Sequence, residues 1–94
     1  MIILQVEHPV PDFDVWKESF DNDPLHRKQS GVKSYRIFRI IGNKNYVLIE
    51  LDFDNLENAE RMKKALEQLW TRVEGQVMMN PQSRIVEVVE KIEY

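Results

Sequence analysis

The amino-acid sequence predicts one α+β domain in which strands and helices follow one another in the order β-α-β-β-α-β. Four segments are rich in β-branched and aromatic residues, and two others place apolar residues three or four positions apart, as on one face of a helix. Proline, glycine and asparagine stand at the boundaries between these segments. The chain has 94 residues, which fits a single domain over residues 1–94.

The first strand is expected over residues 2–8, and Pro9 ends it because proline donates no hydrogen bond to a sheet. Asp12 is a favourable N-cap for the first helix, which we expect to end near Asn22. The apolar stripe of this helix consists of Phe13, Trp16 and Phe20.

The middle of the chain predicts a hairpin. Residues 24–29 are expected to form a second, short turn of helix that Gly31 ends, because glycine accepts the left-handed cap conformation. Residues 32–41 and 46–53 are rich in β-branched and aromatic side chains, and residues 42–45 form the turn between them.

The last third predicts a long helix and a final strand. Asp54 or Asn55 caps the helix, and Gly75 ends it. Residues 77–82 connect it to a strand over residues 84–94. The apolar face of the helix consists of Leu56, Ala59, Met62, Leu66, Leu69, Trp70 and Val73.

This element order favours a ferredoxin-like sandwich. Right-handed crossovers build two split βαβ units with the sheet order 4-1-3-2 and both helices on one face. The first and third strands are the most apolar, as central strands should be, and the second and fourth carry most of the charge, as edge strands often do.

The uncovered sheet face predicts a homodimer. Apolar residues at every second position from Val47 to Phe53 are expected to face the helices. With a four-residue hairpin turn, Arg36 faces the helices and Arg39 faces away; a turn of three or five residues exchanges them. In the first register the open face holds Ile3, Tyr35, Ile37, Ile41, Tyr46 and Leu48. Such a patch favours pairing through the open sheet face over a monomer with a wet face.

Part of the sequence resembles a known superfamily. The residues concerned are Val10-Pro11-Asp12-Phe13-Asp14-Val15-Trp16, Phe20-Asp21, Gly31-Val32 and Tyr35. They are similar to small proteins of the dimeric α+β barrel superfamily, which includes antibiotic-biosynthesis monooxygenase-like and cyclase-like members. The resemblance implies a ferredoxin-like subunit, a dimer and a pocket between the sheet and the helices. It also implies several activities: cofactor-free oxygenation, haem breakdown, isomerisation, cyclisation or ligand sensing.

The haem-degrading branch has Asn on the first strand, Trp on the second helix and His beyond that Trp. This chain has His8, Trp70 and Asn80 in comparable places, so only the Trp matches. Asn80 is a poor axial ligand for haem iron, and we expect no cofactor.

The candidate site lies at one end of the molecule, between the helices and the sheet. His8 is the candidate general base there, although a histidine in such a place is more often structural, bonded to backbone or water. Trp16 and Trp70 could stack on a flat aromatic ligand, although a tryptophan at helical spacing is more often part of a core. The candidate ligand-binding residues are Phe13, Trp16, Arg36, Arg39, Trp70 and Asn80.

Composition excludes several functions. A net charge of −3 argues against nucleic acid as a partner, and no apolar run is long enough to span a membrane. The sequence has no cysteine and shows no signal peptide, which suits the cytoplasm. The sequence therefore favours a cofactor-independent monooxygenase, isomerase or cyclase acting on a small, aromatic ligand. The alternatives are a non-catalytic ligand-binding or sensing dimer, and a structural dimer with a filled core.

Overall fold

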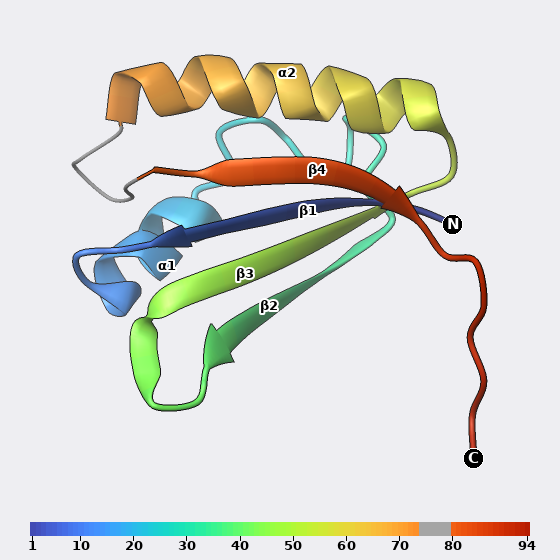
Figure 1. The fold of residues 1–94 in the computed structure, drawn as a ribbon. Helices are drawn as coiled ribbons and strands as arrows, with labels where there is room; N and C mark the ends of the chain where they lie inside the picture. Colours follow the sequence, from blue (N-terminus) through green and yellow to red (C-terminus); the bar gives the residue numbers. More distant parts are fainter. Residues whose placement is uncertain (74–79) are drawn as a thin grey trace.

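A computed structural model describes residues 1–73 and 80–94 and confirms the predicted order of elements (Figure 1). The elements are β1 (Ile2–Pro9), α1 (Phe13–Asp21), β2 (Ser34–Ile40), β3 (Asn43–Phe53), α2 (Leu56–Val73) and β4 (Gln82–Glu87). The expected helix end at Gly75 and most of the expected connector over residues 77–82 lie outside the described residues.

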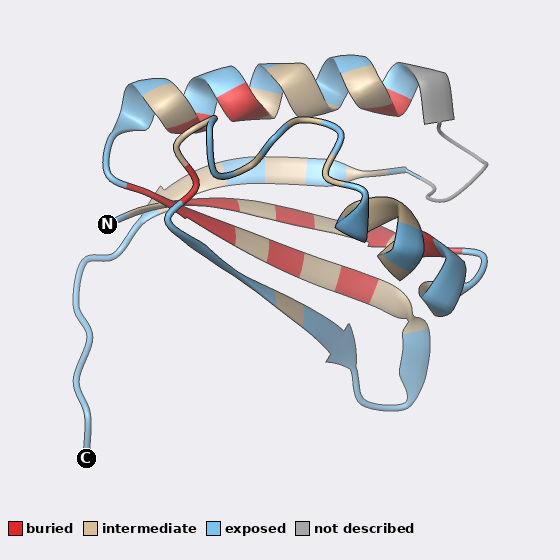
Figure 2. Cartoon of the chain, turned by 180° about the vertical axis from the view of Figure 1, so that it is seen from behind, coloured by how far each residue is buried: buried red, intermediate tan, exposed pale blue. Residues whose placement is uncertain are grey.

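The sheet has the predicted ferredoxin-like topology. Its strand order is β2-β3-β1-β4, so β1 and β3 are central and β2 and β4 are edges. Every neighbouring pair is antiparallel. Both helices pack on one face of the sheet, and their inward residues join those of β1 and β3 in one core (Figures 1 and 2). The opposite face carries no helix.

The core follows the alternation of the two central strands. Figure 2 shows buried and partly buried residues alternating along most of β1 and β3, whereas β2 is mostly exposed. Leu4, Val47 and Phe53 are completely buried, and Ala59 of α2 lies against them in the same cluster. Neither helix of the described chain combines the length and hydrophobicity that a membrane crossing requires.

The predicted cap of α1 is confirmed. The Asp12 carboxylate accepts hydrogen bonds from the backbone N–H groups of Asp14 (2.9 Å) and Val15 (3.3 Å). Asn55 caps α2 in the same way, because its Oδ1 accepts from the N–H of Asn58 at 2.8 Å. These bonds satisfy donors that have no partner inside a helix.

The prediction of a short helix over residues 24–29 is wrong. The segment after α1 is a series of turns in which Asp23 and His26 adopt a positive φ of 50°, which interrupts any helix. Ser30 Oγ donates to the carbonyl of Leu25 at 2.8 Å and holds the segment together. Gly31 has φ 101°, as expected for a residue at the end of such a turn.

The hairpin turn differs from the prediction, and this changes the faces of β2. The turn is Ile41-Gly42, and β3 already begins at Asn43. The register then shifts between Arg39 and Ile40, because a bulge absorbs the extra residues of β3. As a result Arg36 pairs with Glu50 on the open face, and Arg39 pairs with Val47 on the helix face.

A one-residue change of register reverses every side chain of β2. The register in which Arg36 faces the helices is therefore not formed, and of the two arginines it is Arg39 that takes that face. Tyr35 and Ile37 also lie on the helix side, opposite Leu51 and Ile49, and not on the open face. Ile41 belongs to the turn and is fully exposed.

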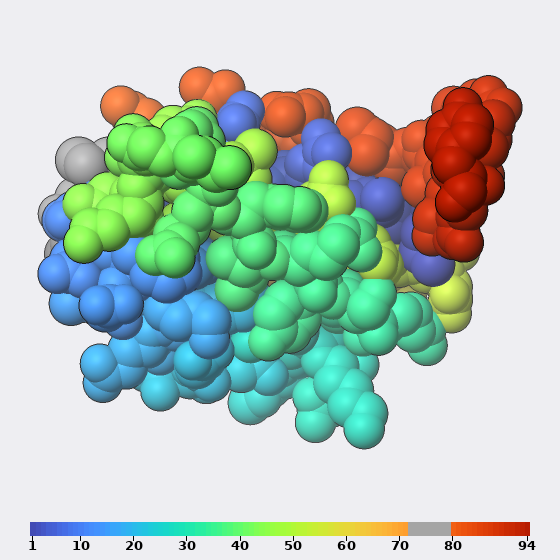
Figure 3. Space-filling view, turned by 90° about the horizontal axis from the view of Figure 1, so that it is seen from below, coloured from blue at the N-terminus to red at the C-terminus, as the bar shows by residue number. Residues whose placement is uncertain are grey.

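The final strand is shorter than the predicted residues 84–94. Strand β4 ends at Glu87, opposite Ile2, and one more bond follows, from Val88 N–H to the Met1 carbonyl. Beyond that point β1 offers no partner, so residues 88–94 leave the sheet (Figure 1). In the space-filling view they stand out from the body at one side (Figure 3).

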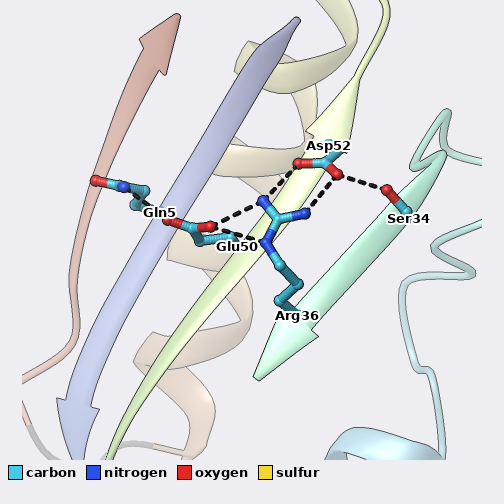
Figure 4. Close-up of polar contacts among 5 residues, drawn as sticks. All are labelled: Gln5, Ser34, Arg36, Glu50 and Asp52. Carbon is cyan, nitrogen blue, oxygen red and sulfur yellow. Dashed lines mark hydrogen bonds and ion pairs between the residues drawn. The ribbon is translucent and has the colours of Figure 1, made fainter. Parts of the chain in front are cut away.

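The open face of the sheet carries a hydrogen-bonded ion network (Figure 4). The Arg36 guanidinium donates to Glu50 at 2.8 and 3.0 Å and to Asp52 at 2.8 and 3.0 Å. Ser34 Oγ also donates to Asp52, and Gln5 donates to Glu50 at 2.9 Å. The network lowers the pKa of Asp52, chiefly through the hydrogen bonds from Arg36.

Candidate functional site

A cavity of about 300 Å³ lies between the helices and the helix face of the sheet. Strands β1 and β3 form its floor, and both helices and the segment between α1 and β2 form its walls. Its described lining consists of Val6, His8, Trp16, Ser19, Phe20, Asn22, Pro24, Leu25, Arg27, Ile49, Leu51, Met62, Leu66, Leu69 and Trp70. The structure thus brings together His8, Trp16 and Trp70, as the sequence predicts.

His8 supplies the titratable group of the cavity. It is the last residue of β1 whose side chain faces the helices, and only 1% of it is exposed. Its Nδ1 lies 3.1 Å from the carbonyl oxygen of Pro9. Because a carbonyl only accepts, Nδ1 carries the proton in this contact, and Nε2 keeps its lone pair.

Nε2 of His8 is open to the cavity. Among the described residues, Nε2 forms no hydrogen bond. No side-chain nitrogen or oxygen there is both inaccessible to solvent and without a hydrogen-bond partner, so Nε2 must be accessible. A water-sized molecule can therefore reach Nε2. Burial lowers the pKa of His8, while the bond to Pro9 opposes that shift. The lowered pKa favours the neutral imidazole at pH 7, and its Nε2 lone pair has no partner among the described residues.

Aromatic rings of α1 extend from His8 along one wall. Trp16 meets the His8 ring edge-on, with centroids 5.8 Å apart and planes at 64°. Phe20, one helical turn later, lies 5.2 Å from Trp16. Phe13 packs against the far side of Trp16 at 5.8 Å and supports it from outside the cavity. These contacts fix the wall, because each ring is held by the next.

A second polar group closes the cavity at the Phe20 end. The Arg27 guanidinium lies over the Phe20 ring at 3.8 Å and within 5.2 Å of the Tyr35 ring. Its Nη1 donates to the carbonyl of Phe20 at 2.9 Å, and its Nε lies 3.5 Å from Asp23. Ser19 and Asn22 line the same end.

Sequence reasoning missed these three polar residues. Residues 24–29 read as a short helix, which hid the turn that brings Arg27 back over α1. The i,i+4 spacing of Asp23 and Arg27 fits a helix as well as this turn, so the sequence offered no signal that distinguishes the two.

The other predicted ligand-binding residues lie outside this cavity. Arg36 is on the opposite face of the sheet, within the ion network. Arg39 faces the helices but covers the outer side of Phe13, with its guanidinium 4.5 Å from that ring. Asn80 lines a separate surface groove beside Glu67. Among the described residues, only Trp70 lines both this groove and the cavity. Within residues 1–73 and 80–94, no three metal-ligating side chains lie close enough together to hold an ion.

Comparison with solved structures identifies proteins with the same fold. No protein-family model and no curated protein matches the sequence. Solved structures match along nearly the whole chain. One is SnoaB, a cofactor-independent oxygenase from Streptomyces nogalater (TM-score 0.76, 7% identity, 99% of this chain and 97% of that chain covered). The chain has the fold of this oxygenase.

Two further matches agree. A candidate antibiotic-biosynthesis monooxygenase from Deinococcus radiodurans has a TM-score of 0.70 at 14% identity, with 100% of this chain and 98% of that chain covered. A dimeric ferredoxin-like protein from an uncultured marine organism has a TM-score of 0.71 at 10% identity, with 97% of each chain covered. These structures confirm the predicted fold.

Proposed function

We propose that the protein is a cofactor-independent monooxygenase, isomerase or cyclase that acts on a small aromatic molecule in the cavity. The observation that carries this proposal is a buried His8 that lines an apolar, aromatic-walled cavity and whose Nε2 has no hydrogen-bond partner among the described residues. Convergent polar groups in an apolar cavity are the usual form of a small-ligand site. The likeness to SnoaB, described as a cofactor-independent oxygenase, supports the reaction type.

His8 acts as the general base. Its Nε2 takes a proton from a phenolic O–H or an activated C–H of the substrate, and Nδ1–H keeps the bond to Pro9. The products of this step are an imidazolium and a substrate anion in contact. Burial opposes the imidazolium, so the reaction depends on that ion pair forming inside the cavity. Trp16 and Trp70 hold the flat substrate against the imidazole.

Turnover of a panel of quinols and phenols tests the proposal. We expect His8→Gln to reduce kcat about 100-fold or more, the usual contribution of a general base. The exposed His26 provides the matched control, and His26→Gln should leave kcat unchanged. If His8→Gln retains the wild-type kcat on a substrate that the wild type converts, His8 is not the base.

The same panel decides the alternative, a non-catalytic binding or sensing dimer. In that case compounds bind in the cavity, Trp16→Ala lowers their affinity, and none of them is converted to product. The Nε2 chemical shift of His8, followed by NMR during titration with the bound compound, reports contact without requiring turnover.

We also propose that two copies pair through the open sheet face. The corrected register leaves a mixed surface there, in which apolar side chains flank the ion network. The apolar members are Ile3, Phe38, Tyr46, Leu48 and Val86. A matched solved structure is described as a dimeric ferredoxin-like protein, which supports this arrangement.

Sedimentation analysis over a concentration series tests the pairing. Phe38 is 42% exposed on the open face, and Leu56, 49% exposed at the start of α2, is its control. We expect Phe38→Arg to raise the dimer dissociation constant at least tenfold and Leu56→Arg to leave it unchanged. A wild-type chain that stays monomeric throughout, or equal effects of both variants, would contradict the proposed interface.

A further inference from the structure

Arg27 is the one fully charged side chain in the described lining of the cavity. The remaining lining residues are apolar or neutral, and the lowered pKa of His8 favours its neutral form at pH 7. Asp23, the partner of Arg27, does not line the cavity; it lines a neighbouring surface groove that Arg27 also lines, beside Lys28 and Lys33. The described lining therefore contains one cationic side chain, paired with Asp23 from outside the lining, among apolar and aromatic groups.

The contacts of Arg27 leave part of its guanidinium available. Of its five N–H groups, one Nη1–H is used on the Phe20 carbonyl, and Nε faces Asp23 at 3.5 Å. Within the described chain, Nη2 makes no hydrogen bond. No side-chain nitrogen there is both inaccessible to solvent and without a partner, so Nη2 is accessible. The side chain is only 16% exposed and is stacked on Phe20, so its orientation is fixed before any ligand arrives.

The two polar groups stand apart along the aromatic wall. His8 contacts Trp16, and Arg27 contacts Phe20, which lies one helical turn, about 5.4 Å, further along α1. A cavity of about 300 Å³ is about twice the size of an engineered 150 Å³ cavity that holds benzene. The space thus suits two fused rings with a substituent at each end.

We propose that the ligand of this cavity is an aromatic carboxylate, and that Arg27 is the residue that selects its charge. The inference deepens the proposed function, because it concerns the same cavity. The carboxylate accepts from Nη2–H of Arg27, and the acidic proton of the opposite ring end meets Nε2 of His8. A planar guanidinium suits a planar carboxylate, and the low-polarity walls strengthen their attraction.

Binding of 6-hydroxy-2-naphthoate and its uncharged isostere, 6-hydroxy-2-naphthamide, tests the role of Arg27. Calorimetric titration of the full chain should show the carboxylate binding about tenfold to a hundredfold more tightly, as expected for one charge-assisted hydrogen bond. Arg27→Gln should remove this preference and leave amide binding within about threefold, which also shows that the variant is folded. Arg27→Lys should keep part of the preference, because lysine keeps the positive charge but lacks the planar guanidinium that can bind a carboxylate through two donors.

Lys28→Gln is the matched control. Lys28 is the neighbouring cation, but it is exposed and does not line the cavity, so its removal should leave the preference unchanged. Equal binding of both compounds to the wild type, or a preference that survives Arg27→Gln, overturns the role of Arg27 and leaves the aromatic cavity intact. If neither compound binds the wild type, the proposed aromatic site and this inference both fail.

Discussion

The substitution Asp52→Asn tests whether the ion network on the open sheet face stabilises the fold. Asp52 is 5% exposed, and its carboxylate accepts two hydrogen bonds from Arg36 and one from Ser34. An asparagine keeps one acceptor oxygen but loses the charge. Hydrogen bonds to charged groups contribute about 1.5–3 kcal/mol, against about 0.5–1.5 kcal/mol for neutral ones.

The expected loss is smaller than the sum of these bonds. Arg36 is 42% exposed and keeps its second partner, Glu50, so water and Glu50 replace part of what Asp52 provides. We therefore expect Asp52→Asn to lower the free energy of unfolding by about 1–2 kcal/mol at pH 7. This is a large part of the 5–15 kcal/mol typical of a small domain.

The effect should depend on pH with a defined sign. The Arg36 hydrogen bonds lower the pKa of Asp52 below its ordinary value of 3.8 in the folded state. Below pH 3.8 the unfolded chain therefore binds a proton that the folded chain does not. The contribution of Asp52 is complete above this pH and is lost as the pH falls through the folded pKa. The difference between the wild type and Asp52→Asn should shrink over that range.

Urea unfolding at pH 7 and pH 3, each at two protein concentrations, measures this contribution. The second concentration separates folding from the proposed pairing through the same face. Asp21→Asn is the control, because Asp21 forms an exposed i,i+4 pair with Lys17 and should contribute no more than about 0.5 kcal/mol. If Asp52→Asn matches Asp21→Asn at pH 7, or keeps the full pH dependence of the wild type, the network does not stabilise the fold as argued.

Three further substitutions test other parts of the structure. Because burial lowers the pKa of His8, the wild type should lose stability as the pH falls below 6.5, and His8→Leu should lack this slope between pH 6.5 and 5 in denaturant titrations. Trp16→Ala should cost about 3–5 kcal/mol in the same assay, since Trp16 is 3% exposed; a loss below about 1 kcal/mol would contradict its place in the core. Gly31→Ala should cost at least about 1 kcal/mol because φ is 101° and a new Cβ would lie 2.7 Å from Asn58 Nδ2. Adding Asn58→Ala should restore only the steric part, and full recovery would show that the backbone is unstrained.

The order of elements was predictable because local patterns determine it. The N-cap at Asp12 and the alternation of β3 are properties of adjacent residues, and both reappear unchanged in the structure. The register of β2 depends instead on how a bulge distributes residues 43–46, and the hairpin sequence allows more than one turn length. The assumed length of the hairpin turn alone decided whether Arg36 or Arg39 was placed on the helix face.

The candidate site was predictable where a regular element carries it. His8, Trp16 and Trp70 follow from the directions of β1, α1 and α2. Arg27 does not, because irregular turns with positive φ at Asp23 and His26 place it, and no periodicity reports such turns. The length of β4 likewise depends on where β1 begins, which is information from the other end of the chain.

The two polar groups of the cavity belong to different kinds of structure. His8 is part of the central strand β1 and pairs with Val47 of β3, whereas Arg27 belongs to an irregular segment between α1 and β2. Such segments accept insertions and exchanges more readily than strands do. If His8 and Arg27 have the roles proposed above, evolution can alter ligand preference through this segment without changing the base. A segment grafted from another protein of this fold should then bring its own ligand preference with it.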